Sequence, residues 1–364
     1  IMEKNIRVAL VGMGAMGKGL FYQCHITPGY ECIAIADIII ERACSCAKWL
    51  GYEYRVVENE NQMNDAIKAG KLAVCADGNL AAICNGANVF IETSNSIIPA
   101  AQFSINAIKT GKHLILMNAE IDLIFGPYLM DLAHKHMVVY SSCDGDQHGV
   151  IKHIVDEIKL WGFDLVMAGN MKGFLDKYSN PEKIIPEAEK RNLDYKMATA
   201  YTDGTKLNIE MALHCNALNL QTISPGMTGP IVKHVKDVLD VFDFKKIHQQ
   251  SRPVVDYILN SQPDGGVFVV GWSENEYQRA MMKYYKMGDG PYYVFYRPYH
   301  LCHVESLGEI TKTIERKTSL LQPDFGFQGN VFSYAKKELK AGELLDGIGG
   351  FALYGMLENV YDKT

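Results

Sequence analysis

The segment 203–214 combines an acid, a lysine, a second acid and a histidine at regular spacing. Lys206, Glu210 and His214 follow one another at four-residue intervals, and Asp203 comes just before them. On a helix, such a series lies on one face. That face could line a substrate cleft, with Lys206 moving a proton and Asp203 or Glu210 orienting a substrate hydroxyl. The alternative is a solvated face whose lysine and glutamate form an i,i+4 ion pair.

Lys172 is a second candidate for the same chemistry. The run Gly169-Asn170-Met171-Lys172-Gly173 ends the predicted strand 163–168, so Lys172 should project from a strand end beside glycines that let a ligand come close. A lysine in a partly closed cleft suits proton transfer, because burial lowers its pKa toward neutrality. Asn170 and His214 are candidate substrate ligands, and His214 and the lysines could also hold a phosphate.

Acidic residues and a histidine also gather in the segment 144–149. Asp144, Asp146 and His148 could bind a divalent metal such as Mg²⁺ or Mn²⁺. The alternative, which we favour, is a hinge loop whose carboxylates cap the following helix, predicted at 150–161. A metal is therefore not expected, and Asp146 is also a candidate substrate ligand.

Residues 6–37 read as strand, glycine-rich turn, helix, strand and acid, which is the context that makes a GxGxxG motif informative. Gly12 would make the tight turn, Gly14 would let a pyrophosphate approach, and Gly17 would let the helix press on the sheet. Free N–H groups at the helix start would hold the anion. The alternative is a glycine-rich turn in a nucleotide-free flavodoxin-like domain. The candidate cofactor-binding residues are Gly12, Gly14, Ala15, Met16, Gly17, Asp37, Arg42, Thr93, Ser94 and Asn118.

The choice between NAD and NADP depends on Asp37 and Arg42. Asp37 should accept the two adenosine ribose hydroxyls and repel a 2′-phosphate, which favours NAD. Arg42 lies close by in the sequence and could offset that repulsion. Both cofactors therefore stay open.

Strands and helices alternate over the first 148 residues, which predicts a doubly wound parallel sheet of the Rossmann type. Thr93, Ser94 and Asn118 follow strands of this sheet at the edge where ligands bind. The expected strands are 6–11, 32–36, 72–76, 89–92, 113–117 and 137–141, and the expected helices are 15–25, 41–50, 61–71 and 99–111.

The pattern beyond residue 148 is α+β. We expect helices at 150–161, 181–191, 231–247 and 303–316, strands at 163–168 and 267–272, and a hairpin that joins 284–287 to 292–296. The predicted domains are 1–148 for dinucleotide binding, 149–322 for substrate binding, catalysis and oligomerisation, and a C-terminal segment 323–364.

Composition excludes several classes of protein. A net charge of −6 without a basic run argues against nucleic-acid binding. No apolar stretch approaches 18 residues, which argues against a membrane protein. Nine cysteines without CxxC spacing suggest buried free thiols in a reducing cytoplasm. We expect a cytoplasmic homo-oligomer that acts on a small molecule.

Five segments together resemble a known family. They are GMGAMG at 12–17, LMNAEIDLIFGPYL at 116–129, GDQHG at 145–149, AYTDGTK at 200–206 and KKELKAGELLDGIGG at 336–350. In this order they resemble the homoserine-dehydrogenase-like oxidoreductases with a C-terminal SAF domain. That group includes the deoxyxylulose-phosphate reductoisomerase-like (DRL) enzymes of isoprenoid biosynthesis. The resemblance implies an NAD(P)-dependent enzyme, and the SAF-like segment is expected to be incomplete.

One departure narrows the implied function. Homoserine dehydrogenases typically carry Asn-Lys after the fifth strand, whereas this chain has Asn118 followed by Ala119. A methyl group cannot hold a hydroxyl or transfer a proton, so Asp203 and Lys206 would best match that family's second acid and lysine. The implied activity is hydride transfer on a small hydroxy or carbonyl substrate, resembling a DRL-type 1-deoxy-D-xylulose 5-phosphate reductoisomerase. The alternatives are a homoserine-dehydrogenase-like polyol or hydroxy-acid dehydrogenase, an isomerase that retains its cofactor, and a non-catalytic dinucleotide-binding regulator.

Overall fold

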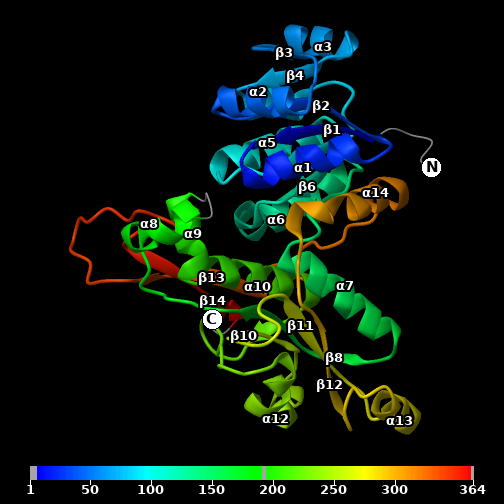
Figure 1. Cartoon of the computed structure of the whole chain (residues 1–364), viewed down its shortest axis with the longest axis vertical. Coiled ribbons are helices and arrows are strands. Elements are labelled where there is room, and N and C mark those ends of the chain that lie inside the picture. The colour runs from blue at the N-terminus through cyan, green and yellow to red at the C-terminus, as the bar shows by residue number, and fades with distance from the viewer. Residues whose placement is uncertain (1–5, 191–193, 362–364) are drawn as a thin grey trace. The chain divides into compact units, whose positions relative to one another are not determined.

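A seven-stranded parallel sheet is formed by the N-terminal part of the chain (Figure 1). The computed structural model describes residues 6–190 and 194–361. The strand order is β3-β4-β2-β1-β5-β6-β7. The chain first builds the sheet on one side of the central strand β1, with β2, β3 and β4, and then on the other side, with β5, β6 and β7. The strands are β1 (Ile6–Val11), β2 (Tyr30–Ala36), β3 (Tyr54–Val56), β4 (Leu72–Cys75), β5 (Val89–Glu92), β6 (His113–Leu116) and β7 (Tyr140–Ser142).

Both faces of this sheet are buried. Ala9 and Val11 on β1 belong to one apolar cluster, and Val8 and Leu10 belong to another, because successive side chains of a strand point to opposite faces. The expected doubly wound parallel sheet is confirmed. The helices of this part are α1 (Ala15–Ile26), α2 (Ile40–Trp49), α3 (Glu60–Lys68), α4 (Gly78–Ile83), α5 (Ile98–Lys109), α6 (Ala119–Lys135) and α14 (Ser306–Arg316), with the 3₁₀ turn η2 (Cys302–Val304).

A second, five-stranded sheet is mixed. Its order is β12-β11-β8-β10-β9, and the central strand β8 pairs parallel with β10 and antiparallel with β11. The strands are β8 (Asp164–Lys172), β9 (Gln221–Thr222), β10 (Val254–Leu259), β11 (Val267–Trp272) and β12 (Tyr292–Arg297). The helices are α7 (Gln147–Leu160), α8 (Pro181–Lys190), α9 (Tyr195–Thr202), α10 (Thr205–Leu218), η1 (Val235–Asp237), α11 (Val238–Val241), α12 (Phe244–His248) and α13 (Glu276–Tyr284).

A C-terminal antiparallel hairpin, β13 (Gly329–Ala335) and β14 (Leu353–Asn359), lies along α10 (Figure 1). Three polar side chains of α10 fix it there. The Thr205 hydroxyl accepts from the backbone N–H of Gly355 at 2.8 Å, and the Asn208 amide oxygen accepts from Leu357 at 2.8 Å. The Asn216 amide oxygen accepts from two backbone N–H groups, those of residues 328 and 329, at 2.8 and 3.0 Å.

The predicted helix over 231–247 is wrong. This segment contains three short pieces, η1, α11 and α12, instead of one helix. Phe242 has an extended backbone, with φ −112° and ψ 139°, and Asp243 then caps α12 by accepting from the N–H of Lys246 at 3.1 Å. A cap at Asp243 therefore starts a new helix where apolar periodicity alone suggests continuity.

The predicted hairpin around Gly288–Gly290 is also wrong. Tyr284 ends helix α13, which Asn275 caps by accepting from the N–H of Gln278 at 3.0 Å. Strand β12 pairs with β11, not with residues 284–287. Tyrosines favour strands by propensity, but this N-cap signal overrides that preference. The helix expected at 181–191 is found as α8 up to Lys190, and residue 191 lies outside the described residues.

The chain divides into two compact units. The first unit contains 1–149 and 301–323, and the second contains 150–300 and 324–364. The predicted boundaries differ from this division in two places, because 301–323 return to the first unit and the C-terminal segment belongs to the second. All nine cysteines are free and seven of them are buried. Within 6–190 and 194–361, none of the helices has the length and apolar character needed to cross a membrane.

Candidate active site

The turn between β1 and α1 can be built only with glycine at two positions. Gly12 has φ +92°, and a Cβ there would lie 2.7 Å from the backbone nitrogen of Ser94. A Cβ on Gly17 would lie 1.7 Å from the carbonyl oxygen of Gly12. These contacts give Gly12 the tight turn and Gly17 the close packing that the motif predicts.

Gly14 differs from its two neighbours in the motif. It is the N-cap of α1, with no side-chain cap hydrogen bond, and a Cβ added there would meet no atom within 4 Å. Ala15 and Met16 follow in the first turn, where N–H groups have no partner within the helix. Open space in front of a helix N-terminus is what a pyrophosphate requires, so these residues fit a dinucleotide.

We expect Gly14→Val to fold normally and to lose most of its NAD(P)H affinity, because the new side chain would occupy the space that the pyrophosphate needs. Calorimetric titration with NADH and NADPH measures the affinity, and thermal unfolding measures the fold. Two control variants separate the effect on cofactor binding from an effect on stability. Gly308→Val, on α14 and also facing open space, should bind normally, whereas Gly17→Ala should lose stability. Near-native affinity in a folded Gly14→Val protein would refute the motif assignment.

Asp37 is almost entirely buried at the end of β2. Its Oδ2 accepts from the backbone N–H of Met13 at 2.7 Å, and its Oδ1 accepts from that of Ile39 at 2.8 Å. The carboxylate thereby ties the glycine turn to β2, and each oxygen keeps a further lone pair for a ribose hydroxyl. Arg42 is exposed on α2. The choice between NAD and NADP stays open.

Three polar residues shape the neighbouring strand ends. The Thr93 hydroxyl lies 2.8 Å from the carbonyl oxygen of Val11 and 2.6 Å from that of Gly12, so it can donate a hydrogen bond to either and stabilise the turn. The Ser94 and Ser96 hydroxyls lie 2.8 Å apart, and the Asn118 amide donates to the Ser96 carbonyl at 2.7 Å. These bonds hold the loops in place, and direct contact of Thr93, Ser94 or Asn118 with a cofactor stays a prediction.

The polar stripe of α10, formed by Lys206, Glu210 and His214, is buried. The exposed fraction is 6% for Lys206, 2% for Glu210 and 0% for His214, so the alternative of a solvated face is wrong. Successive helical residues turn by about 100°, which puts the stripe roughly opposite the side that holds the hairpin. Helix α10 also packs against β10. Within the helix, His214 Nδ1 lies 2.9 Å from the carbonyl oxygen of Glu210.

Asp203 is held by its neighbours. Its Oδ2 forms a fully buried ion pair with Lys336 at 2.8 Å, and its Oδ1 accepts from the N–H of Thr205 at 2.9 Å. Burial raises the pKa of the Asp203 carboxyl, although Lys336 and Thr205 oppose that rise. Lys336 also donates to the carbonyls of Ser179 and Gly350, at 2.6 and 2.8 Å. These contacts indicate that Asp203 positions the start of α10, and its predicted catalytic role remains a prediction.

Asn170 has the clearest sign of an absent ligand. It lies two residues before the end of β8, fully buried, and neither its Oδ1 nor its Nδ2 has a hydrogen-bond partner. An unpaired buried amide costs about 1–3 kcal/mol, which makes Asn170 a candidate to bind a ligand. Lys172, two residues on, shares its face of the strand.

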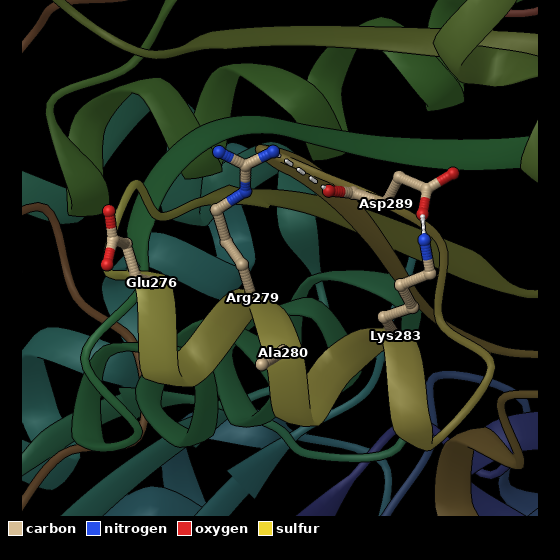
Figure 2. Close-up of a pocket in the computed structure, with 5 residues that line it drawn as sticks. All are labelled: Glu276, Arg279, Ala280, Lys283 and Asp289. Atoms are coloured by element: carbon tan, nitrogen blue, oxygen red, sulfur yellow. Dashed lines mark hydrogen bonds and ion pairs between the residues drawn. The ribbon is translucent and has the colours of Figure 1, made fainter.

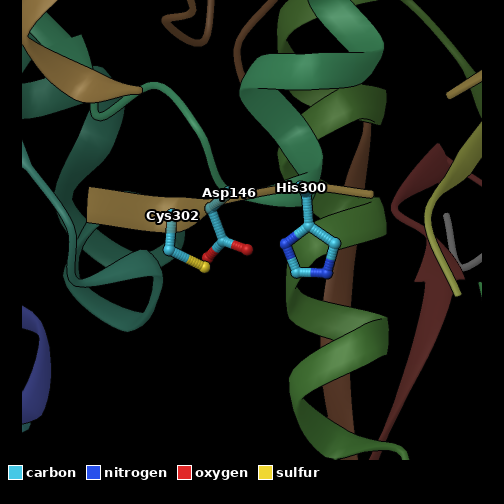
Figure 3. Close-up of side chains that lie close together, drawn as sticks. All are labelled: Asp146, His300 and Cys302. Carbon is cyan, nitrogen blue, oxygen red and sulfur yellow. The ribbon is translucent and has the colours of Figure 1, made fainter. Parts of the chain in front are cut away.

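The segment 144–149 is partly helical, since α7 begins at Gln147. Asp146 Oδ1 accepts from the N–H of Gln147, the first residue of α7, at 2.8 Å. The N–H of Cys302 donates to the Gly145 carbonyl at 2.6 Å within the first unit, and Figure 3 shows Cys302 and Asp146 close together. His300, also drawn there, belongs to the second unit. Among the described residues, Asp144, Asp146 and His148 do not form one group of converging ligand atoms, so the less favoured alternative of a divalent metal gains no support.

Two residues that sequence reasoning missed are Lys336 and Glu92. Lys336 is 133 positions from Asp203, and no local pattern reveals such a pair. Glu92 ends the apolar strand β5 and is completely buried. An acid at the end of a buried strand was visible in the sequence, and this was the signal that could have identified it.

Two surface hollows in the second unit lie apart from this chemistry. One, of about 260 Å³, is lined by α13 and Asp289. Figure 2 shows Arg279 and Lys283 reaching Asp289, and the Lys283–Asp289 pair, 2.8 Å long, is 73–78% exposed. The other, of about 420 Å³, is lined by α12 and residues 288–292. Neither hollow is lined by a candidate residue, and exposed ion pairs of this kind are common on surfaces.

The first unit has the fold and the glycine turn of a dinucleotide-binding domain, and it is joined to an α+β unit with buried polar groups. These features are typical of NAD(P)-dependent oxidoreductases. Residues 145–306 match the family model described as "Oxidoreductase DRL, catalytic domain". The chain is therefore an NAD(P)-dependent oxidoreductase. The match covers the catalytic domain only, and the SAF-like character of the tail stays a prediction.

Solved structures with a similar fold have low sequence identity. A probable dehydrogenase from Thermotoga maritima is 11% identical, with 88% of this chain and 91% of that chain covered and a TM-score of 0.48. A putative myo-inositol dehydrogenase from Sinorhizobium meliloti 1021 is 10% identical, with coverages of 86% and 90% and a TM-score of 0.47. The 1-deoxy-D-xylulose 5-phosphate reductoisomerase from Zymomonas mobilis, in complex with NADPH, is 16% identical over 57% of each chain, with a TM-score of 0.40. The sequence has no significant match among curated proteins.

Proposed function

We propose that the protein transfers hydride between NAD(P) and a small hydroxy or carbonyl substrate, in the manner of a DRL-type 1-deoxy-D-xylulose 5-phosphate reductoisomerase. The matched region 145–306 contains every residue that we predicted to be catalytic, namely Lys172, Asp203, Lys206 and Glu210. It also contains the three candidate substrate ligands, Asp146, Asn170 and His214. The match of a catalytic-domain model to the region that holds these residues supports the proposal.

The single observation that carries the proposal is the unpartnered amide of Asn170. Such an amide can donate from Nδ2 and accept at Oδ1, which suits a substrate with adjacent hydroxyl and carbonyl groups. Lys206 would transfer the proton to or from the reacting oxygen, and Glu210 would orient a substrate hydroxyl. The nicotinamide supplies the hydride chemistry, so the chain has only to bind, orient and move this proton. For a phosphorylated substrate, Lys172 and His214 would hold the phosphate.

A substrate screen tests this function directly. The purified protein would be assayed with 1-deoxy-D-xylulose 5-phosphate and NADPH or NADH, and with polyols and hydroxy acids in the presence of NAD⁺ or NADP⁺. The signal is the absorbance of the reduced nicotinamide. Turnover of the phosphorylated ketose supports the reductoisomerase proposal, and turnover of a polyol or hydroxy acid alone points to the dehydrogenase alternative. Dinucleotide binding without turnover of any substrate would favour a non-catalytic regulator.

Asn170→Leu should separate function from stability. Removing an unpaired buried amide should leave stability unchanged or raised, whereas loss of the substrate contact should raise KM at least about tenfold. The matched control is Asn216→Leu, because that amide accepts two backbone hydrogen bonds from the hairpin. The control should lower the free energy of unfolding. If Asn170→Leu instead destabilises the protein as much as Asn216→Leu and leaves KM unchanged, Asn170 is not a substrate ligand.

A further inference from the structure

The three strand ends at the centre of the first sheet define a path for a bound dinucleotide. Strands β2, β1 and β5 are neighbours in that order, and Asp37, the glycine turn and Glu92 stand at their carboxyl ends. With adenosine ribose at Asp37 and pyrophosphate at Gly14, the nicotinamide half must continue over β5. The sheet changes direction between β1 and β5, which is where open α/β sheets bind ligands.

Glu92 is the last residue of β5 and stands beside this path. Its register partners are Val11 on β1 and Leu116 on β6. Its Oε1 accepts from the backbone N–H of Ser94 at 2.9 Å, whereas its Oε2 is buried and has no hydrogen-bond partner. A buried carboxyl oxygen without a donor is costly, so a ligand that supplied one would recover that cost.

The surroundings of Glu92 place its ionisation near neutral pH. Burial raises the pKa of the carboxyl to about 7, while the Ser94 and Asn118 groups act in the opposite direction. Glu120, in the first turn of α6, is the charged group that acts on it and raises the pKa further. Its register partner on β1, Val11, carries no charge.

We propose that Glu92 is a further ligand of the bound dinucleotide, and that its Oε2 accepts a hydrogen bond from a donor on the nicotinamide half. The donor is either the carboxamide NH₂ or a hydroxyl of the adjoining ribose, since both are hydrogen-bond donors that a carboxylate can pair with. This inference rests on the proposed dinucleotide site of the first unit. It adds a residue that fixes the position of the reacting ring.

The proposal gives the affinity for NADH a definite pH dependence. Only the ionised carboxylate can accept at both oxygens, so the apparent dissociation constant is the intrinsic one divided by the ionised fraction. With half-ionisation near pH 7, the affinity should fall about tenfold from pH 8 to pH 6. Binding at pH 7 should release about half a proton. NADH is the correct probe, because the 2′-phosphate of NADPH titrates in the same range.

Calorimetric titration at pH 6, 7 and 8, in buffers of different ionisation enthalpy, measures both quantities. Glu92→Gln should bind NADH with an affinity that no longer changes with pH in this way. Glu120→Gln, which removes the neighbouring charge, should move the midpoint below pH 7, so that the affinity falls less between pH 8 and pH 6 than in the wild type. A repeat with ADP-ribose identifies the donor, since a pH dependence that persists indicates the ribose and one that disappears indicates the carboxamide.

Several outcomes would overturn the inference. They are no proton release by the wild-type protein at pH 7, an affinity that rises toward pH 6, or a folded Glu92→Gln protein with the wild-type pH profile. The measurement on the wild type needs no variant, so it decides the matter even if Glu92→Gln does not fold. Absence of binding of both NADH and NADPH would refute the dinucleotide site itself, and with it this inference, whereas NADH binding without the pH dependence would refute only the role of Glu92.

Discussion

Lys206→Met should lower turnover at least about a hundredfold while leaving the protein folded and its affinity for the dinucleotide unchanged. A side chain that supplies a proton or stabilises an oxyanion contributes on the order of 10²–10⁴-fold in rate. The competing expectation, a solvated lysine in an ion pair worth about 0.3–0.5 kcal/mol, does not apply, because Lys206 is buried. Methionine preserves most of the apolar stem and removes the charge.

The control for this experiment is Lys283→Met. Lys283 also lies in the second unit and pairs with Asp289, but its side chain is 73% exposed. Its turnover should stay within a few-fold of the wild type. Steady-state kinetics on an identified substrate, with thermal unfolding and NADH titration, separate catalysis from folding and cofactor binding. We expect Lys172→Met to behave like Lys206→Met if the two lysines serve one site. Turnover within a few-fold of wild type in both variants would refute this placement of the active site.

Lys336→Met should lower the free energy of unfolding by about 3–5 kcal/mol, which is the usual cost of breaking a buried ion pair from one side. The loss leaves the Asp203 carboxylate without its counter-ion and two backbone carbonyls without their donor. Because this ion pair joins the C-terminal hairpin to the start of α10, the hairpin should also loosen. Denaturant unfolding measures the energy, and hydrogen exchange at β13 and β14 measures the loosening.

The adjacent residue offers a matched control. Lys337 pairs with Glu343 at the surface, so Lys337→Met should change stability little. A double variant, Asp203→Leu with Lys336→Met, should recover much of the loss, since two apolar side chains leave no buried charge unpaired. Equal effects of Lys336→Met and Lys337→Met would show that the buried ion pair does not hold the hairpin.

Local signals predicted the dinucleotide part of the molecule well. A Cβ on Gly12 or Gly17 would meet atoms of the turn itself or of Thr93 and Ser94 after the neighbouring strand, as the motif's spacing predicts, whereas Gly14 faces open space. The stripe on α10 was predicted as one helical face from its period of about 3.6 residues. Its burial was not predicted, because burial depends on elements such as β10 that pack against α10 and come later in the chain. Asp203 and Lys336 illustrate the same limit, since neither residue has a neighbour in sequence that indicates the other.

The sequence-based prediction failed where apolar periodicity or strand propensity competed with a helix-capping residue. Between 231 and 247 the apolar periodicity favours a helix, but Asp243 caps a new one. The tyrosines at 284–287 favour a strand, but the helix capped by Asn275 continues to Tyr284. In both places the start of a helix at a capping residue outweighs the propensity of the residues that follow.

The return of residues 301–323 to the first unit has a consequence for synthesis of the chain. The segment is integral to that unit, because the Tyr30 hydroxyl donates to the Leu307 carbonyl at 2.7 Å and Leu307 packs in the core behind β1. Ser142, at the edge strand β7, donates through its N–H to the Leu321 carbonyl at 2.9 Å. A ribosome adds roughly 5–20 residues each second. After the first 149 residues have been made, on the order of ten seconds or more therefore pass before α14 and the contact with the edge strand β7 can form. During that interval the nascent sheet exposes apolar surface that a chaperone could hold.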